Sequence, residues 1–94
     1  MKEDIRLSDI VRSTQGRDRG KLYMVVNCDE DFLFLSDGKY RKLGGPKKKR
    51  RKHVRLECEC TATAGEKLRR GIRVTDSELR STLSDYMAES QEEF

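Results

Sequence analysis

The sequence predicts a mainly β fold, a small antiparallel barrel followed by a C-terminal helical segment. Short runs of aliphatic, aromatic and β-branched residues recur before this segment, separated by turns rich in glycine and aspartate. Several short strands joined by tight turns are typical of a small barrel or a strongly bent sheet. Nearer the C-terminus the apolar residues follow the period of a helix. We therefore expect a barrel over residues 1–62, with a basic loop at 44–53, and a helical extension over residues 63–94 that packs on the barrel or on a partner.

The first three strands are expected from runs of apolar residues. Residues 8–13 support a first short strand, while residues 21–27 and 32–35 are rich in β-branched, aromatic and aliphatic side chains and form the next two. Both ends of the chain are polar, so residues 1–7 and 90–94 should be frayed. Alternation along the second strand divides its side chains between two faces: Leu22, Met24 and Val26 on one, Tyr23 and Val25 on the other.

Turn-forming residues place the connections between strands. Gly16 and Gly20 bracket a polar loop after the first strand, where glycine adopts positive φ at little cost. Ser-Asp-Gly at residues 36–38 is a hairpin signal, which makes residues 40–43 the expected returning strand. Residues 53–60 alternate, so a closing strand is expected there with these side chains on one face: Val54, Leu56, Cys58 and Cys60.

Two helices are expected in the C-terminal segment. Thr75 and Glu78 form a capping box, in which the hydroxyl and the carboxylate satisfy free amides of the first turn. A shorter helix over residues 65–70 precedes it, with Leu68 facing inward and Gly71 as its stop. The longer helix has an apolar stripe at helical spacing: Leu79, Leu83, Tyr86 and Met87.

Positive charge is concentrated between residues 39 and 55. This segment holds ten Lys and Arg and no Asp or Glu, and residues 47–52 are six consecutive cations. It carries +10 in a chain whose other residues sum to −6. Such clustering opposes folding through self-repulsion and indicates a polyanionic partner, whereas a solvated run without a partner is the weaker interpretation. Because Gly44, Gly45 and Pro46 interrupt regular pairing, we expect the run to be a loop tethered at both ends to the barrel.

Composition and motifs argue against several other classes of protein. No apolar run is long enough to span a bilayer or to act as a signal peptide, so we expect a cytoplasmic protein without a membrane partner. The odd number of cysteines disfavours a disulfide scaffold. Cys28, His53, Cys58 and Cys60 lack the spacing of zinc modules, so buried, reduced cysteines are the favoured interpretation. No catalytic constellation or phosphate-binding glycine motif is visible, which predicts neither an enzyme nor a cofactor.

One stretch, residues 11–26 (VRSTQGRDRGKLYMVV), resembles a KOW motif, the strand–loop–strand unit of several ribosomal proteins and transcription elongation factors. The matching features are two apolar strands, Gly16 and Gly20 around Arg-Asp-Arg, and Lys21. The similarity spans residues 8–56 and continues through Asp37-Gly38-Lys39, Arg41-Lys42-Leu43, Pro46-Lys47-Lys48-Lys49 and His53. This part of the chain resembles the bacterial KOW-domain RNA-binding proteins related to the ribosomal protein L14e group.

The resemblance implies an SH3-like barrel that binds RNA, usually ribosomal RNA. We expect a ribosomal or ribosome-associated protein of the large subunit, monomeric when free, whose Lys and Arg side chains neutralise phosphates. Asp18 should brace its loop by accepting hydrogen bonds from backbone amides. Two interpretations of Tyr40 are about equally supported: it stacks on an RNA base, or it belongs to the core of the sheet. The expected RNA-binding residues are Arg17, Arg19, Lys21, Lys39, Tyr40, Arg41, Lys42, Lys47, Lys48, Lys49, Arg50, Arg51, Lys52, His53 and Arg55.

Other hypotheses remain open at this point. A KOW barrel also suits a protein-interaction adaptor of the transcription machinery, which would contact RNA polymerase or nascent RNA. Residues 46–52 have the composition of a nuclear localisation signal, which arms that bind ribosomal RNA share. The least supported hypothesis is a regulator that binds metal through the cysteines and His53. If residues 47–52 only bind RNA, changing all of them to glutamine should weaken binding and leave folding intact.

Overall fold

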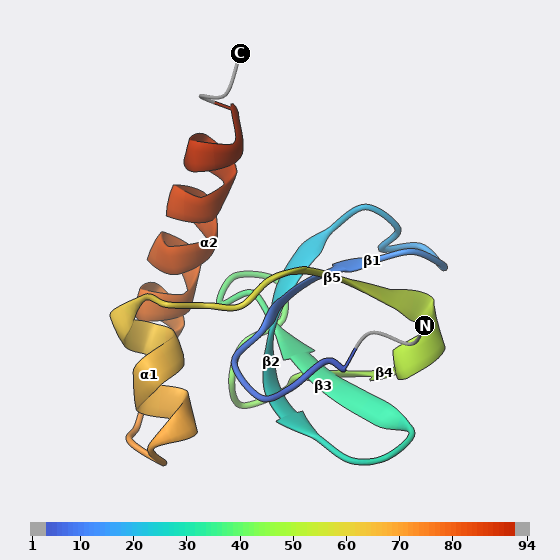
Figure 1. Cartoon of the computed structure of the whole chain (residues 1–94), viewed down its shortest axis with the longest axis horizontal. Helices are drawn as coiled ribbons and strands as arrows, with labels where there is room; N and C mark the ends of the chain where they lie inside the picture. The colour runs from blue at the N-terminus through green and yellow to red at the C-terminus, as the bar shows by residue number, and fades with distance from the viewer. Residues whose placement is uncertain (1–3, 92–94) are drawn as a thin grey trace.

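Figure 1 shows the computed structural model, which describes residues 4–91. These residues form five strands, one short 3-10 helix and two α-helices. The strands are β1 (Ile10–Ser13), β2 (Leu22–Cys28), β3 (Phe32–Ser36), β4 (Lys47–Arg50) and β5 (Val54–Cys58). The 3-10 helix η1 (Arg51–His53) joins β4 to β5, and α1 (Thr63–Arg69) and α2 (Asp76–Gln91) follow. A small antiparallel sheet with a C-terminal helical segment is therefore confirmed, as are the first three predicted strands.

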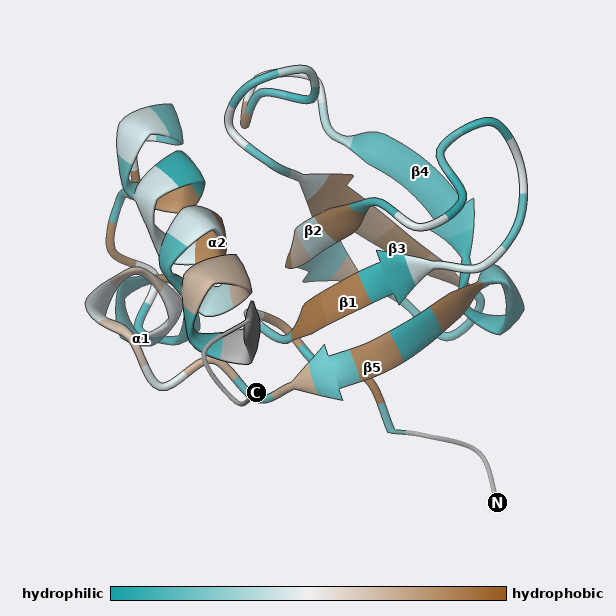
Figure 2. Ribbon diagram, turned by 90° about the horizontal axis from the view of Figure 1, so that it is seen from above, coloured by the Kyte–Doolittle hydropathy of each residue, from teal (hydrophilic) through white to brown (hydrophobic). Residues whose placement is uncertain are grey.

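The strands of the described chain belong to one antiparallel sheet in the order β4-β3-β2-β1-β5. The first four strands form a meander, and β5 then pairs with the edge of β1 that β2 leaves free. The two edge strands, β4 and β5, are consecutive in the chain and are separated only by the three residues of η1. The two edges of the sheet therefore come together at η1, and the sheet is strongly bent, as the view from above shows (Figure 2).

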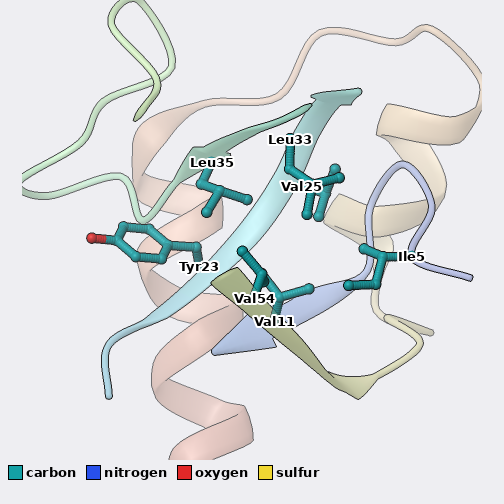
Figure 3. Close-up of a cluster of buried hydrophobic side chains, with 7 residues drawn as sticks. All are labelled: Ile5, Val11, Tyr23, Val25, Leu33, Leu35 and Val54. Carbon is teal, nitrogen blue, oxygen red and sulfur yellow. The ribbon is translucent and has the colours of Figure 1, made fainter. Parts of the chain in front are cut away.

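Alternation along β2 supplies two hydrophobic clusters, one on each face of the sheet. Tyr23 and Val25 lie on the inner side of the bend, where Figure 3 shows them with Ile5, Val11, Leu33, Leu35 and Val54. Leu22, Met24 and Val26 face the other way, as predicted. The two helices cover this outer face and bury Ala64, Leu79 and Leu83 against it. The helical segment thus packs on the sheet.

The fourth strand is not where the hairpin signal placed it. Residues 40–43 are not a strand, and the segment 44–53 that was expected to be a loop contains β4 and η1. The backbone carbonyl of Arg41 accepts hydrogen bonds from the amides of Asp37 and Gly38, so the chain closes a tight loop before any ladder begins. β4 then pairs with β3 along its whole length. Lysine is tolerated there because β4 is an edge strand, where charge discourages pairing with other chains.

The closing strand β5 is shorter than predicted, and its apolar side chains do not share one face. The ladder with β1 shifts register between Ile10, which lies opposite Cys58, and Val11, which lies opposite Leu56. This irregularity leaves one extra residue on β5 and reverses the alternation. Val54 and Leu56 therefore pack with the inner cluster, whereas Cys58 and Cys60 pack with the outer cluster.

The predicted helix signals are largely confirmed. The amide of Glu78 donates to the Thr75 hydroxyl at 3.1 Å, and the amide of Thr75 donates to the Glu78 carboxylate at 3.2 Å. Gly71 has φ of +72° just after α1, in the conformation that a helix stop requires. Within the apolar stripe of α2, Leu79 and Leu83 are buried, whereas Met87 is 49 % exposed.

The segment before β1 is not a frayed lead-in where the structure describes it. Ile5 is buried in the inner cluster, and its carbonyl accepts a hydrogen bond of 2.7 Å from the guanidinium of Arg51. Residues 1–3 lie outside the described residues. At the other end α2 continues through Gln91, so the predicted tail overlaps the helix. Residues 92–94, the rest of that tail, also lie outside the description.

Candidate nucleic-acid interface

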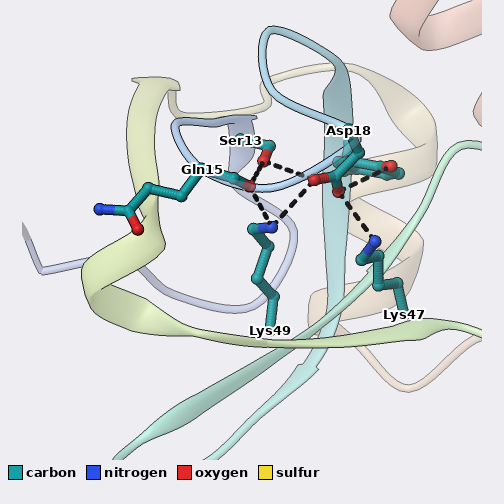
Figure 4. A network of polar contacts seen from close by, with 6 residues as sticks. Ser13, Gln15, Asp18, Lys47 and Lys49 are labelled. Atoms are coloured by element: carbon teal, nitrogen blue, oxygen red, sulfur yellow. Dashed lines mark hydrogen bonds and ion pairs between the residues drawn. The ribbon is translucent and has the colours of Figure 1, made fainter.

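The loop between β1 and β2 is built around the buried carboxylate of Asp18 (Figure 4). Asp18 is 5 % exposed and accepts hydrogen bonds from the Ser13 hydroxyl at 2.9 Å and the Tyr23 hydroxyl at 3.1 Å. The Lys49 ammonium lies 2.9 Å from one carboxylate oxygen, and that of Lys47 lies 3.3 Å from the other. Asp18 therefore braces the loop as expected, but through side chains and not through backbone amides.

The same network determines the ionisation of its members. Burial raises the pKa of the Asp18 carboxyl, but the hydrogen bonds from Lys49, Ser13 and Tyr23 outweigh burial and hold this pKa well below its ordinary value. Burial, followed by the negative charge of Asp18, raises the pKa of Tyr23 above its ordinary value. Lys49 is 9 % exposed and also donates to the Gln15 carbonyl at 2.6 Å. Lys49 therefore connects β4 to the loop inside the molecule.

The tip of this loop points its cations to solvent. Gly16 and Gly20 have φ of +92° and +89°, which confirms the predicted tight turn. Arg17 and Arg19, which flank Asp18, are exposed. The loop thus presents two guanidinium groups on a backbone that Asp18 holds in place from beneath.

Side chains alternate along β4, so the run of cations is divided between two environments. Lys47 and Lys49 point toward Asp18, as Figure 4 shows. Lys48 and Arg50 are exposed and lie over the ring of Phe32, at 4.3 Å and 5.1 Å from its centroid. The aromatic ring on the neighbouring strand supports the two outward cations by cation–π contact.

In η1, some side chains hold the fold together and others face solvent. Arg51 is half-buried and donates to the carbonyls of Asp29 and Ile5, at 2.8 Å and 2.7 Å, so it holds the two segments together. Lys52 is exposed. His53 is half-buried, and its carbonyl accepts a hydrogen bond from the amide of Thr14, the residue after β1. Arg55 is exposed on β5, the opposite edge strand from β4, where it pairs with Glu57.

Tyr40 is not a core residue, because its side chain is 71 % exposed. The ammonium groups of Lys21 and Lys39 lie 5.0 Å and 5.1 Å from the centre of its ring. Lys21 follows the first basic loop and Lys39 opens the basic segment, so the ring lies where the two regions meet. This junction joins residues that the sequence separates and forms the centre of the candidate interface.

Three residues outside the predicted set of RNA-binding residues hold the Tyr40 loop in place. The carboxylate of Asp37 accepts hydrogen bonds from the amides of Lys39 and Arg41, at 2.9 Å and 2.8 Å. From α2, the Arg80 guanidinium donates a hydrogen bond to the Gly38 carbonyl at 2.7 Å. The Asp76 carboxylate, also on α2, accepts one from the Leu43 amide at 2.7 Å. Asp37 was detectable as an aspartate preceding glycine in a turn. The contacts from α2 bridge distant parts of the chain, and no local signal marks them.

The structure therefore separates the predicted binding residues by exposure. Lys47, Lys49, Arg51 and His53 are buried or half-buried. The exposed members are Arg17, Arg19, Lys21, Lys39, Tyr40, Arg41, Lys42, Lys48, Arg50, Lys52 and Arg55. Only the side chains of this second group are fully accessible to a ligand. The candidate interface therefore carries less positive charge than the sequence predicted, but it is still strongly basic.

Within residues 4–91, no group of three or more His, Cys, Asp or Glu side chains is arranged to hold a metal ion. The three cysteines are unpaired thiols, with Cys60 buried and the other two half-buried. In the same residues no helix has the length and apolar character needed to cross a membrane.

Comparison with known proteins does not assign a family. No protein-family model matches the chain, and a search of curated proteins finds no significant match.

Proposed function

We propose that this protein is a non-catalytic RNA-binding module of the translation apparatus, which binds ribosomal RNA in the cytoplasm as a ribosomal or ribosome-associated protein. The observation that carries the proposal is the exposed basic surface around Tyr40, where two lysines from separate segments flank one aromatic ring. Cations beside an exposed ring suit a ligand with both phosphates and bases.

The architecture supports the finer part of the proposal, a KOW unit in an SH3-like barrel. β1, the loop with Gly16 and Gly20, and β2 form the strand–loop–strand arrangement that the motif implies. The edge strands β4 and β5 approach each other at η1, which is the arrangement that a nearly closed barrel needs. In such a barrel, Arg17 and Arg19 would project from one rim, on the loop whose Asp18 contacts Lys47 and Lys49.

The spread of the exposed cations favours a polyanion over a small ligand with a single charged group. The exposed cations extend over the β1–β2 loop, the Tyr40 loop, β4 and η1, which is wider than one carboxylate or phosphate requires. If five or six of them engage phosphates, the logarithm of the binding constant should fall with the logarithm of salt concentration at a slope of roughly −4 to −5. RNA supplies such an array of charges, and the large ribosomal subunit is the proposed location.

Sedimentation of a cell lysate tests the proposal. We expect the protein to migrate with the large ribosomal subunit at low salt and to leave it as salt is raised, because phosphate contacts weaken. Migration away from ribosomes at every salt concentration, with RNA polymerase recovered alongside the protein, would contradict the proposal and favour the transcription adaptor. A variant with Arg70 and Arg73 changed to glutamine, both exposed at or just after the end of α1, serves as a control for general loss of charge.

A further inference from the structure

Tyr40 differs from the other aromatic residues that the structure describes, because it alone belongs to the exposed class. Phe32, Phe34 and Tyr86 are half-buried, and Tyr23 is buried in the inner cluster. An aromatic ring with 71 % of its surface in water contributes little to the core. Its place between two lysines, in a loop that the fold holds firmly, indicates a use in binding.

Hydrogen bonds fasten the loop that carries Tyr40 on both sides of the tyrosine. Asp37 accepts two amide hydrogen bonds on either side of the tyrosine, and Arg80 and Asp76 fasten the loop to α2. Gly38 allows the close approach of the helix, since a Cβ at this position would lie 2.2 Å from the Asp76 carbonyl oxygen. A ring on a pre-ordered loop loses less conformational entropy on binding than a ring on a mobile tail.

We infer that Tyr40, Lys21 and Lys39 form a subsite for one unpaired nucleotide of the RNA, which makes a loop, bulge or strand end the preferred target. This inference rests on the proposed RNA-binding function. In an A-form helix the base faces are covered by neighbouring bases, so a protein ring reaches them only where a base has left the stack. An exposed tyrosine offers such a base a stacking surface, which is how aromatic residues bind single strands.

The two lysines suit the exchange that binding requires. Their contacts with the Tyr40 ring are exposed cation–π interactions, which are weaker than or comparable to stacking of a base on the ring. A base that enters therefore displaces an ammonium group from the ring face. The displaced group has a flexible stem and stays beside the nucleotide, where the flanking phosphates replace the ring as its partner.

Two hairpin RNAs with the same stem test the inference, one fully paired and one carrying a single bulged 2-aminopurine. We expect the protein to bind the bulged hairpin about 10-fold more tightly and to quench the 2-aminopurine fluorescence by stacking. Tyr40→Ala should bring the two affinities within about 2-fold and abolish the quenching, whereas Tyr40→Phe should retain both. Lys21→Gln with Lys39→Gln should weaken binding of both hairpins, since phosphates are common to them.

The controls distinguish failure of the inference from failure of the proposed function. Ile72→Ala, at another exposed apolar side chain with 46 % exposure, should leave the preference unchanged. If both hairpins bind equally and Tyr40→Ala has no effect, the subsite is wrong while RNA binding stands. If neither hairpin nor large-subunit ribosomal RNA binds, the proposed function is wrong and the subsite with it.

Discussion

Lys49 belongs to a run of six cations, yet its side chain is 9 % exposed and its ammonium contacts Asp18 at 2.9 Å. A buried ion pair stabilises only when its remaining hydrogen bonds are also made, and Lys49 donates one to the Gln15 carbonyl. Asp18 receives others from Ser13 and Tyr23. At the scale of single residues, the basic segment therefore includes groups that maintain the fold as well as groups that face solvent.

Replacement of Lys49 by methionine should destabilise the protein, because it leaves the buried Asp18 carboxylate with Lys47 as its only cation. We expect the free energy of unfolding to fall by about 2 to 4 kcal/mol. Lys48→Met, one residue away on the exposed face, should change it by less than about 0.5 kcal/mol. Urea denaturation of both variants measures the difference, and equal losses would show that the Asp18 network does not stabilise the fold.

The sequence does not reveal which cations are internal, because the decisive partner is distant. Asp18 and Lys49 are separated by 31 residues, and nothing near Lys49 distinguishes it from Lys48. The expectation that residues 47–52 can all be changed without affecting folding therefore cannot apply equally to all six residues. We expect folding to survive the change of the exposed Lys48, Arg50 and Lys52, but to be weakened by the loss of the buried Lys49.

At the scale of elements, α2 is the support of the Tyr40 loop. Its first turn reaches this loop through Asp76 and Arg80, while Leu79 and Leu83 bury the helix against the sheet. The function of the helical extension within the molecule is therefore to cover the outer face of the sheet and to position one loop of the interface.

Gly38→Ala should break this arrangement. The new Cβ would lie 2.2 Å from the Asp76 carbonyl oxygen, and the φ of +76° at this position strains any residue with a side chain. We expect a loss of about 2 kcal/mol or more in stability. Gly44→Ala is the matched control, because a Cβ there meets nothing within 4 Å. Thermal unfolding compares the two, and similar melting temperatures would refute the proposed contact.

Glu57 on β5 connects the sheet to α2 and should make stability depend on pH. Burial raises its pKa, but hydrogen bonds from Arg12, Tyr86 and Arg55 outweigh burial and lower the pKa from 4.5 to about 2. A carboxyl whose folded pKa is depressed contributes stability above its unfolded pKa and loses it as pH falls through the folded value.

We therefore expect Glu57→Gln to be destabilising by about 1 to 3 kcal/mol near pH 7, with a gap to wild type that narrows between about pH 5 and pH 2. Denaturant unfolding at several pH values measures this gap. A gap that stays constant through this range would mean that the carboxylate charge contributes nothing. Asp18 also has a depressed pKa, so both proteins should still lose stability in acid.

Local patterns in the sequence predict most elements but not β4. The runs that became β1, β2 and β3 are rich in aliphatic, aromatic and β-branched residues, and the capping box marks the start of α2. Lysine and arginine are poor strand formers, so residues 47–50 resemble a loop. What makes them a strand is pairing with the apolar β3, a non-local effect, together with the loop closed by the Arg41 carbonyl.

At the scale of the whole molecule, the exposed cations concentrate on four segments: the β1–β2 loop, the Tyr40 loop, β4 and η1. Exposed acidic residues lie on α2, at Asp85 and Glu89, and also in the turn between β2 and β3, at residues 29–31. Glu30 and Asp31 line the same pocket as Arg50, Arg51 and Lys52, so acidic groups border one side of the basic surface. We expect an RNA to be attracted to the cations and kept away from this border. The concentration of cations was visible in the sequence as a +10 segment within an otherwise acidic chain.

The central claim is that the exposed cations bind RNA phosphates, and the salt dependence of binding tests it most directly. Fluorescence anisotropy with the bulged hairpin between about 50 and 200 mM KCl should give a slope of roughly −4 to −5 for the wild-type protein. Changing Lys48, Arg50 and Lys52 to glutamine should make the slope shallower by about 2 to 3 while the melting temperature is retained. The double change of Arg70 and Arg73 to glutamine should leave it unaltered. Absent or salt-independent binding, or a slope that the triple change does not alter, would contradict the account.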